Sequence, residues 1–368
     1  MVHSHTVPVR TRRASQRNGQ QRGRALKATT PARRTLRELA SEAGVSPMTV
    51  SRVLNKRSEV APETRQKVER IIAESGFVPS RSARARHRGR HGLIDVVVPG
   101  LDHVYNFDII RGVEAALEPT GYRLVVSCSY DAKQERMWLA KLSEGRTDGA
   151  ILVLQPGQSR SLAALRRRHI PFVVVDPVEE MGPELPSVGA TNWAGARAAT
   201  DYLLSLGHRR IAFIGGPSQI MCSQERLSGY RSALEEAQVT VATDLVRPGN
   251  FFQEAGYKQT VALMDLPEPP TAIFAANDTQ AFGVYAALRA LGKVVPHDVS
   301  VVGFDDTLVA QLVTPPLTTV CQPLANMGRV AVSQLLGLLE GKPLDSPRVE
   351  LATTLVIRES CARPRRRR

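Results

Sequence analysis

The sequence predicts a small all-α head followed by an α/β body of two doubly wound lobes with parallel sheets. Three observations support this prediction. Basic residues are concentrated in the N-terminal part of the chain, short helices with capping signals follow at residues 35–76, and from Leu93 onward buried strands alternate with amphipathic helices. The 368 residues are enough to form such a two-part protein with proper cores.

The charge of the chain is distributed unevenly. Residues 1–91 contain 21 Lys and Arg but only 6 Asp and Glu, whereas residues 92–368 contain 28 basic and 29 acidic residues. A basic head on a neutral body is typical of a nucleic-acid-binding module joined to a second domain. Four cysteines lie far apart without a CxxC pair, so neither a zinc site nor a disulfide framework is predicted. Because no apolar run could span a membrane and no secretory signal is found, we expect a cytoplasmic protein.

The first helix of the head is expected after a basic arm. Residues 1–34 are rich in Arg, Gln, Thr and Pro without apolar periodicity, so we expect them to be disordered. Ordered structure is expected to begin at Thr35, which forms a capping box with Glu38. An apolar helix face follows, and Gly44 ends this helix with a tight turn.

Two further helices complete the head, which spans residues 35–79. Ser46 caps the second helix, Pro47 stands at its first position, and a third helix is predicted from Pro62 to Gly76. Two short helices around a turn, with a third packed across them, form a helix-turn-helix unit. The outer face of the second helix suits the major groove of DNA, although similar helix pairs with an outward arginine occur in many proteins. Its outward residues are Met48, Thr49, Ser51, Arg52 and Asn55.

Residues 35–85 resemble the DNA-binding head of the lactose/galactose repressor (LacI/GalR) family. The resemblance rests on the TVSRVLN core, the VAPETR helix start and the GFVPS exit. It implies that three residues read bases, namely Pro47, Met48 and Arg52. It further implies that a second set mainly holds phosphates, namely Thr35, Thr49, Ser51, Asn55 and Thr64.

Residues 80–92 are the predicted hinge segment. In the family that the head resembles, this segment forms a short helix on the operator, and a leucine from each subunit wedges into the minor groove and kinks the DNA. Here Ala83 occupies the expected small-residue position, but Arg86 stands at the wedge position. Arginine is attracted to a narrow minor groove but cannot unstack bases, so strong kinking is not expected. The alternative is a flexible basic linker that makes only phosphate contacts.

The body, residues 93–362, contains two series of strands and helices. The first has strands at 93–100, 123–129, 149–155 and 171–177 and a helix at 107–121. The second begins near Asn192, with helices at 193–208, 225–237 and 279–292, strands at 210–216, 271–278 and 299–306, and a closing segment at 354–360. These repeats predict two lobes with a discontinuous boundary near 190 and 320, and a ligand cleft at the carboxyl ends of the strands. A basic tail follows at 363–368.

The body also resembles the LacI/GalR family, in the motifs SVGATNWAG, LGHRRIAFIGG, RLSGYRSAL, AIFAANDTQAFGVYAAL, VPHDVSVVGFDD and PPLTTVCQPLANMG. With the head, the resemblance covers nearly the whole chain after Thr35 and implies a body like a periplasmic sugar-binding protein. By position it implies the cleft residues Asp176, Arg226, Phe251, Asn277, Asp305 and Gln322.

The chemistry of these residues suits a polar ring ligand. Carboxylates accept hydrogen bonds from sugar hydroxyls, Arg and Asn donate them, and Phe251 offers an aromatic face. Tyr105 and Asn106 follow the first strand, where the other wall of the cleft is expected. Simpler roles are open: Asp176 could be a turn residue, Asp305 a helix cap, and Phe251 part of the core.

These features predict a sequence-specific transcriptional regulator, a repressor of carbohydrate-utilisation genes that a small sugar releases from double-stranded operator DNA. We expect a homodimer, since no leucine-heptad tail is found, and no catalytic residue, metal or cofactor. A purine is the alternative ligand, because related regulators bind nucleobases in the same cleft. A solute-binding protein of a transporter would share the body but not the basic head. An enzyme is not indicated, since no G-x-G-x-x-G after a strand, Walker loop, HExxH or G-x-S-x-G is found.

Overall fold

The computed structural model describes residues 34–54, 59–75, 91–129, 131–143, 147–154 and 158–365. Two compact units divide the chain, Met1–Ser80 and Arg81–Arg368, and each is described by itself. In the described part of the chain, no helix is both long enough and apolar enough to cross a membrane. The predictions for the arm before Arg34, for most of the hinge and for the last three arginines fall outside these residues.

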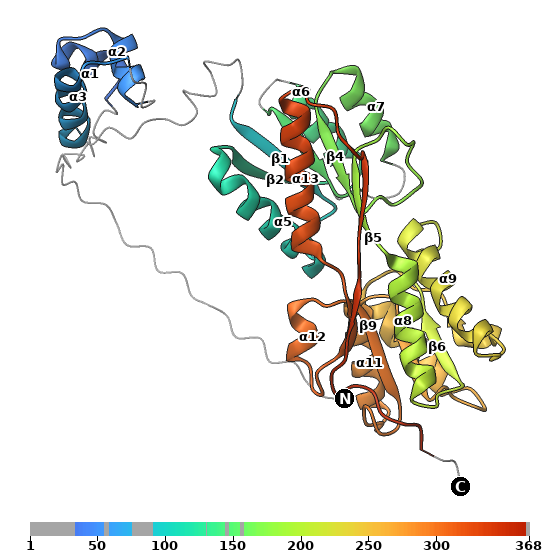
Figure 1. Ribbon diagram of the computed structural model, residues 1–368. Coiled ribbons are helices and arrows are strands. Elements are labelled where there is room, and N and C mark those ends of the chain that lie inside the picture. The colour runs from blue at the N-terminus through green and yellow to red at the C-terminus, as the bar shows by residue number, and fades with distance from the viewer. Residues whose placement is uncertain are drawn as a thin grey trace, which may run out of the picture. The chain divides into compact units, whose positions relative to one another are not determined.

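The head contains the three predicted helices (Figure 1). Their bounds are α1 (Leu36–Ala43), α2 (Pro47–Leu54) and α3 (Pro62–Glu74). The capping box of α1 is confirmed, because the Glu38 amide donates to Thr35 Oγ1 and the Thr35 amide donates to Glu38 Oε2. Gly44 ends α1 with a φ of 65°, a left-handed conformation that glycine adopts without steric cost. The core of the head comprises Leu39, Ala40, Ala43, Val50, Val53, Val60 and Val68.

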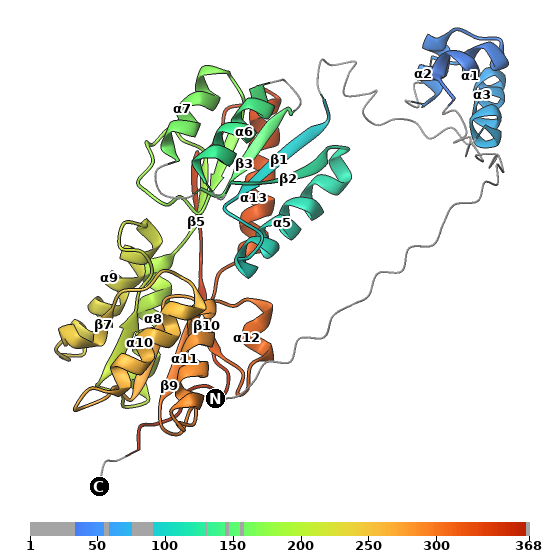
Figure 2. The same ribbon diagram turned by 180° about the vertical axis from the view of Figure 1, so that it is seen from behind.

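The first lobe of the body is a six-stranded parallel sheet covered by helices on both faces (Figures 1 and 2). Its strands, in spatial order, are β11 (Arg348–Leu351), β5 (Ser187–Ala190), β4 (Phe172–Val175), β3 (Gly149–Leu152), β1 (Leu93–Val98) and β2 (Arg123–Cys128). One face packs on α5 (Val104–Leu117) and α13 (Leu324–Leu339). The other face packs on α6 (Ala132–Ser143) and α7 (Ser159–Arg167). The near-continuous apolar run of β1 matches its burial on both sides, since every residue after Leu93 is buried.

The second lobe repeats this plan. Its strands, in spatial order, are β12 (Thr354–Val356), β10 (Thr318–Cys321), β9 (Ser300–Asp305), β8 (Ala272–Ala275), β6 (Ile211–Ile214) and β7 (Val246–Arg247). One face packs on α8 (Asn192–Ser205) and α9 (Met221–Glu236), and the other on α10 (Gln253–Met264), α11 (Asp278–Ala290) and α12 (Leu308–Leu312). The sheet is parallel except at its edge, where β12 pairs antiparallel with β10. The closing segment therefore departs from the purely parallel sheet that the repeats predict.

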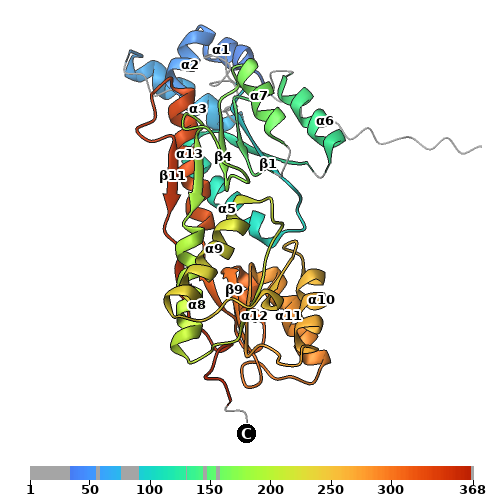
Figure 3. The same cartoon turned by 90° about the vertical axis from the view of Figure 1, so that its right-hand side faces the viewer.

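The chain passes between the lobes three times (Figure 3). The passages lie between β5 and α8, between β10 and α13, and between β11 and β12. Thr191 and Thr353 join two of them, since the Thr353 amide donates to Thr191 Oγ1 at 3.0 Å and Thr353 Oγ1 donates to the Thr191 carbonyl at 3.1 Å. Because the strands of both sheets end toward these passages, their carboxyl ends face one another across the space between the lobes.

Candidate DNA-binding face and inter-lobe cleft

The outer face of α2 presents the side chains that the sequence predicts to read bases. Pro47, Met48 and Arg52 are exposed, and Met48 keeps 57% of its surface accessible. An exposed apolar side chain beside an arginine can contact a thymine methyl group while the guanidinium binds a guanine edge. Arg52 lies 3.6 Å from the Glu59 carboxylate, with both side chains at least half exposed. Such an exposed ion pair is weak, so it does not prevent Arg52 from turning to DNA.

The predicted phosphate-binding residues surround this face. Thr49 is held by Ser46, whose Oγ accepts from the Thr49 amide at 3.1 Å and lies 3.0 Å from Thr49 Oγ1. Thr35 is exposed at the start of α1, whereas Ser51 and Thr64 are half-buried. Three further predicted DNA contacts lie outside the described residues: Asn55, Ala83 and Arg86.

The predicted cleft residues lie at the carboxyl ends of the strands. Asp176 follows β4, Asp305 ends β9, and Asn277 follows β8 by two residues. Asp176, Phe251 and Asp305 have φ angles of 52°, 67° and 114°, in the region that non-glycine residues seldom adopt. Each such residue costs of order 1–3 kcal/mol, and such strain is concentrated at ligand sites. Three of the six cleft residues implied by the family resemblance are thus held in costly backbone conformations.

Arg226, on α9, is the centre of the second lobe's wall. Its side chain is only 3% exposed, Nε donates to Asn192 Oδ1 at 2.9 Å, and Nη1 donates to the Ala276 carbonyl at 2.6 Å. Nη1 also lies 3.6 Å from Asp305 Oδ1. The guanidinium carbon stands 3.8 Å from the centre of the Phe304 ring, a distance suited to a cation–π contact. These contacts fix the orientation of the guanidinium before any ligand arrives.

Asp305 and Gln322 form a buried polar pair beside Arg226. Gln322 Nε2 donates to Asp305 Oδ1 at 2.7 Å. Burial raises the pKa of Asp305 to about 7, against the lowering effects of Arg226 and of the Gln322 hydrogen bond. Gln322 Oε1 is buried and has no hydrogen-bond partner among the described residues. An unpaired buried acceptor is costly, so it marks a place where a hydroxyl of a ligand or a water would bind favourably.

The wall contributed by the first lobe contains Tyr105 and Asp176. The Tyr105 hydroxyl donates to Asp176 Oδ2 at 2.8 Å. Burial raises the pKa of Asp176, while the charge of Arg226 across the cleft and the Tyr105 hydrogen bond oppose the rise. Asn106 is buried, but its Nδ2 donates to the Gly100 carbonyl, so this amide stabilises its own loop.

Two contacts connect the lobes at the edges of the cleft. The rings of His103 and Phe252 lie 4.7 Å apart, one from each lobe. The Met221 amide donates to the Val178 carbonyl at 2.8 Å, again from one lobe to the other. The structure therefore has the two walls in contact, a closed arrangement of the cleft.

Two predicted ligand contacts are engaged within their own lobe. Asn277 caps α11, where its Oδ1 accepts from the Gln280 amide at 2.9 Å, and its Nδ2 donates to the Phe251 carbonyl at 3.1 Å. The Phe251 ring lies against Gly216, at which a Cβ atom would stand 2.2 Å from the ring. In this structure, Asn277 therefore holds the strained Phe251 loop in place.

Sequence reasoning missed three buried groups near these residues. Asn192 accepts the hydrogen bond from Arg226, Cys222 lies on the same helix as Arg226, and Asp278 lies behind Asp305. Burial raises the pKa of the Cys222 thiol to about 12, so it is a poor nucleophile. Asp278 and Asn192 carried a signal, since Asp278 stands next to the predicted Asn277 and Asn192 lies in the motif SVGATNWAG.

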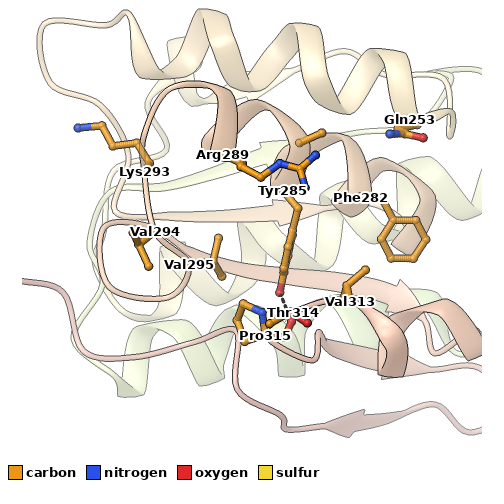
Figure 4. A pocket seen from close by; sticks show the side chains of 11 residues that line it. Gln253, Phe282, Tyr285, Arg289, Lys293, Val294, Val295, Val313, Thr314 and Pro315 are labelled. Carbon is orange, nitrogen blue, oxygen red and sulfur yellow. Dashed lines mark hydrogen bonds between the residues drawn. The ribbon is translucent and has the colours of Figure 1, made fainter.

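A separate pocket of about 630 Å³ lies on the second lobe between α11 and two loops (Figure 4). Tyr285 lines this pocket, and its hydroxyl donates to the Pro315 carbonyl at 2.9 Å. Arg289 and Lys293 also line the pocket. None of its lining residues is a predicted cleft residue. In the described part of the chain, no group of three His, Cys, Asp or Glu residues is arranged to hold a metal ion.

Comparisons with known proteins agree with both parts of the chain. Residues 35–80 match the bacterial regulatory proteins of the lacI family, and residues 200–361 match the periplasmic binding protein-like domain. The HTH-type transcriptional repressor CytR of Escherichia coli (strain K12) is 34% identical over 329 residues, which cover 89% of this chain and 96% of CytR.

Two solved structures are similar over both parts. The complex of the transcriptional regulator CelR with cellobiose has a TM-score of 0.70 at 34% identity, covering 89% of this chain and 100% of that chain. The lac repressor dimer bound to operator and the anti-inducer ONPF has a TM-score of 0.78 at 30% identity, covering 89% and 99%. These relatives are regulators of transcription and not enzymes.

Proposed function

This chain belongs to the LacI family of bacterial regulatory proteins and is a DNA-binding transcriptional repressor, and we propose that a small sugar in its inter-lobe cleft releases it from DNA. Genes of carbohydrate utilisation are the proposed targets, since a repressor released by a sugar suits their control. The proposal places the protein in the cytoplasm, where its operator is found.

The observation that carries this proposal is the polar lining of the closed cleft. Arg226, Asp305 and Gln322 come together on one side, and Tyr105 and Asp176 on the other. A sugar hydroxyl both donates and accepts, so it can bridge a carboxylate and a guanidinium at once. The unpaired Gln322 Oε1 adds an acceptor with no partner in the described residues. CelR, which is similar over the same length, binds cellobiose in its solved complex.

We further propose that two copies of the chain bind one pseudo-palindromic operator. One helix-turn-helix head reads only a few base pairs, and a two-fold axis doubles the readout. The similar lac repressor structure is a dimer on its operator. The proposed DNA contacts are Thr35, Pro47, Met48, Thr49, Ser51, Arg52, Asn55, Thr64, Ala83 and Arg86. The proposed ligand contacts are Tyr105, Asp176, Arg226, Phe251, Asn277, Asp305 and Gln322.

The proposal is tested by a thermal-shift screen of pentoses, hexoses, disaccharides, nucleosides and nucleobases, followed by operator-binding assays with each hit. We expect a sugar to raise the melting temperature and to weaken operator binding. Hits confined to nucleobases would contradict the sugar assignment. A sugar that tightens operator binding would reverse the proposed direction of control.

A further inference from the structure

Asp278 is a buried carboxylate that does not line the cleft. It is the first residue of α11 and is fully buried. Its Oδ2 accepts from the Thr307 amide at 2.8 Å and from Thr307 Oγ1 at 3.1 Å, and its Oδ1 accepts from Thr319 Oγ1 at 2.6 Å. A buried carboxylate is costly unless such hydrogen bonds compensate it. An apolar side chain would fill the same space at lower cost, so we expect Asp278 to have a role beyond packing.

These hydrogen bonds hold the turn that carries the cleft carboxylate. Asp305 and the next residue, Asp306, have φ angles of 114° and 57°, both in the strained left-handed region. Thr307 follows them directly and is the N-cap residue of α12. Asp306 pairs with Arg358 at 2.6 Å, and the Thr307 amide donates to Asp278, so an ion pair and a buried hydrogen bond hold the strained turn just after Asp305.

The same carboxylate also holds the neighbouring strand. Thr319 lies on β10, opposite Gly303 of β9, and β10 ends one residue before Gln322. A Cβ atom on Gly303 would stand 2.4 Å from Asp278 Oδ1, so the backbone of β9 packs directly against this carboxyl group. Asp278 thus bonds to a residue just after Asp305 and to a residue just before Gln322, the two partners in the buried cleft pair.

We propose that Asp278 is a positioning residue for the cleft, which holds Asp305 and Gln322 in the geometry that receives the ligand. This inference rests on the proposed function only in taking the cleft as the ligand site. The two carboxyl groups also interact electrostatically: burial and the nearby charge of Asp305 raise the pKa of Asp278. Substitution of Asp278 is therefore expected to change the positions of Asp305 and Gln322, although Asp278 itself does not contact the ligand.

The first test needs no ligand. Hydrogen–deuterium exchange of the full chain compares wild type with Asp278→Ala, Asp278→Asn and the control Thr260→Val. Thr260 is an equally buried threonine of the same lobe, whose hydroxyl donates only to the Gly256 carbonyl within α10. In Asp278→Ala we expect exchange across residues 303–312 to accelerate roughly tenfold, because the Thr307 amide loses its acceptor. Asparagine keeps an acceptor there, so Asp278→Asn should restore most of the protection. Unchanged exchange in Asp278→Ala would overturn the proposal.

The second test measures calorimetric binding of D-ribose and cellobiose beside operator affinity without sugar. For a sugar that binds wild type, Asp278→Ala should weaken binding by roughly tenfold or more, Asp278→Asn by less, and Thr260→Val not at all. Operator affinity should stay within about twofold of wild type, as the head is a separate unit. Equal sugar affinity in wild type and Asp278→Ala would overturn the inference. If neither sugar binds wild type, the sugar assignment is in question, and the exchange experiment alone decides the role of Asp278.

Discussion

Gln322 Nε2 donates a 2.7 Å hydrogen bond to Asp305 Oδ1, and this bond joins the floor of the cleft to a passage between the lobes. Asp305 ends β9 in the second lobe, whereas Gln322 stands between β10 and α13, where the chain returns to the first lobe. A ligand that contacts Asp305 would therefore also act on a residue in one of the passages between the lobes. We expect this pair of side chains to contribute to the coupling of ligand binding with lobe closure.

Sugar binding is expected to strengthen as the pH rises through neutrality. Burial raises the pKa of Asp305 to about 7, and the ionised carboxylate accepts hydrogen bonds from sugar hydroxyls more strongly than the neutral acid. Below this pKa the affinity should therefore rise by up to about tenfold per pH unit and level off above it. Calorimetric titrations between about pH 5.5 and pH 8.5 measure this profile.

The same shift affects the stability of the free protein with the opposite sign. The folded-state pKa of Asp305 lies above the ordinary value, so the folded protein binds more protons than the unfolded chain between about pH 4 and pH 7. The contribution of Asp305 to the free energy of unfolding is therefore present at low pH and is lost as the pH rises through about 7. Asp305→Asn should remove both dependences, and a sugar affinity that is flat with pH in wild type would contradict this account.

Arg226→Ala should abolish the response to sugar and leave operator binding intact. A guanidinium that donates to a sugar hydroxyl would contribute of order 1.5–3 kcal/mol per hydrogen bond to binding. The substitution removes this proposed donor, and the residue belongs to the cleft and not to the head. It also leaves Asp305 without its cation, so the melting temperature should fall. Arg231, exposed on the same helix, provides the matched control Arg231→Ala. If sugar releases the operator equally from wild type and from Arg226→Ala, the cleft assignment fails.

Arg52→Ala should lower specific operator affinity by about 1–3 kcal/mol if the guanidinium reads a base. Glu59→Gln should leave or slightly raise the affinity, because it frees Arg52 from the 3.6 Å ion pair. Arg70→Ala, at an exposed arginine of α3, controls for the loss of one positive charge. Fluorescence anisotropy on operator and on random DNA distinguishes the roles: equal losses on both would make Arg52 a phosphate anchor.

Much of the head could be predicted from sequence because its signals are local. The capping box of Thr35 and Glu38 and the turn at Gly44 involve neighbours within a few residues, and all are present in the structure. Many strands and helices of the body are likewise visible as apolar patterns, and the family resemblance indicated which strand ends carry the cleft. The helices α6, α7, α10 and α13 were not among those predicted. The antiparallel pairing of β12 has no such local signal.

Contacts between distant segments could not be predicted in the same way. His208 looks like a helix-end residue in the sequence, yet it is buried and bonds to Thr271, Ser300 and the Ala362 carbonyl. The strained φ of Asp305 accompanies contacts of the following turn with distant residues, since Arg358 pairs with Asp306 and Asp278 binds Thr307. The three hydrogen bonds of Asp278 come from residues 29 and 41 positions away.

Arg86, which lies outside the described residues, is expected to act by charge. Arg86→Lys should keep most of the operator affinity, since either cation is attracted to a narrow minor groove. Arg86→Leu should provide an apolar wedge and increase DNA bending. Circular-permutation gels measure the bend, and a strong bend with the wild type would contradict the expectation that Arg86 acts by charge without kinking the DNA.

Phe252→Ala should weaken sugar binding, although Phe252 is not one of the proposed ligand contacts. Its ring lies 4.7 Å from that of His103 on the other lobe, and we expect this contact to be lost when the lobes open. Removing it lowers the population of the closed arrangement, and the apparent affinity of a ligand falls in proportion to that population. An aromatic pair contributes about 0.5–1.5 kcal/mol beyond the area it buries, so we expect a loss of about two- to tenfold.

The conservative change Phe252→Tyr keeps the ring and should retain wild-type affinity. Operator affinity without sugar should not fall in Phe252→Ala, because release of DNA requires the closed, sugar-bound state under the proposed induction. The sugar concentration needed for half-release of the operator should rise by the same factor as the calorimetric dissociation constant. A variant that binds sugar as wild type does would show that the His103–Phe252 contact does not stabilise closure. A variant that loses operator affinity without sugar would show instead that the closed arrangement is the DNA-binding one, and that the sugar acts in the opposite direction.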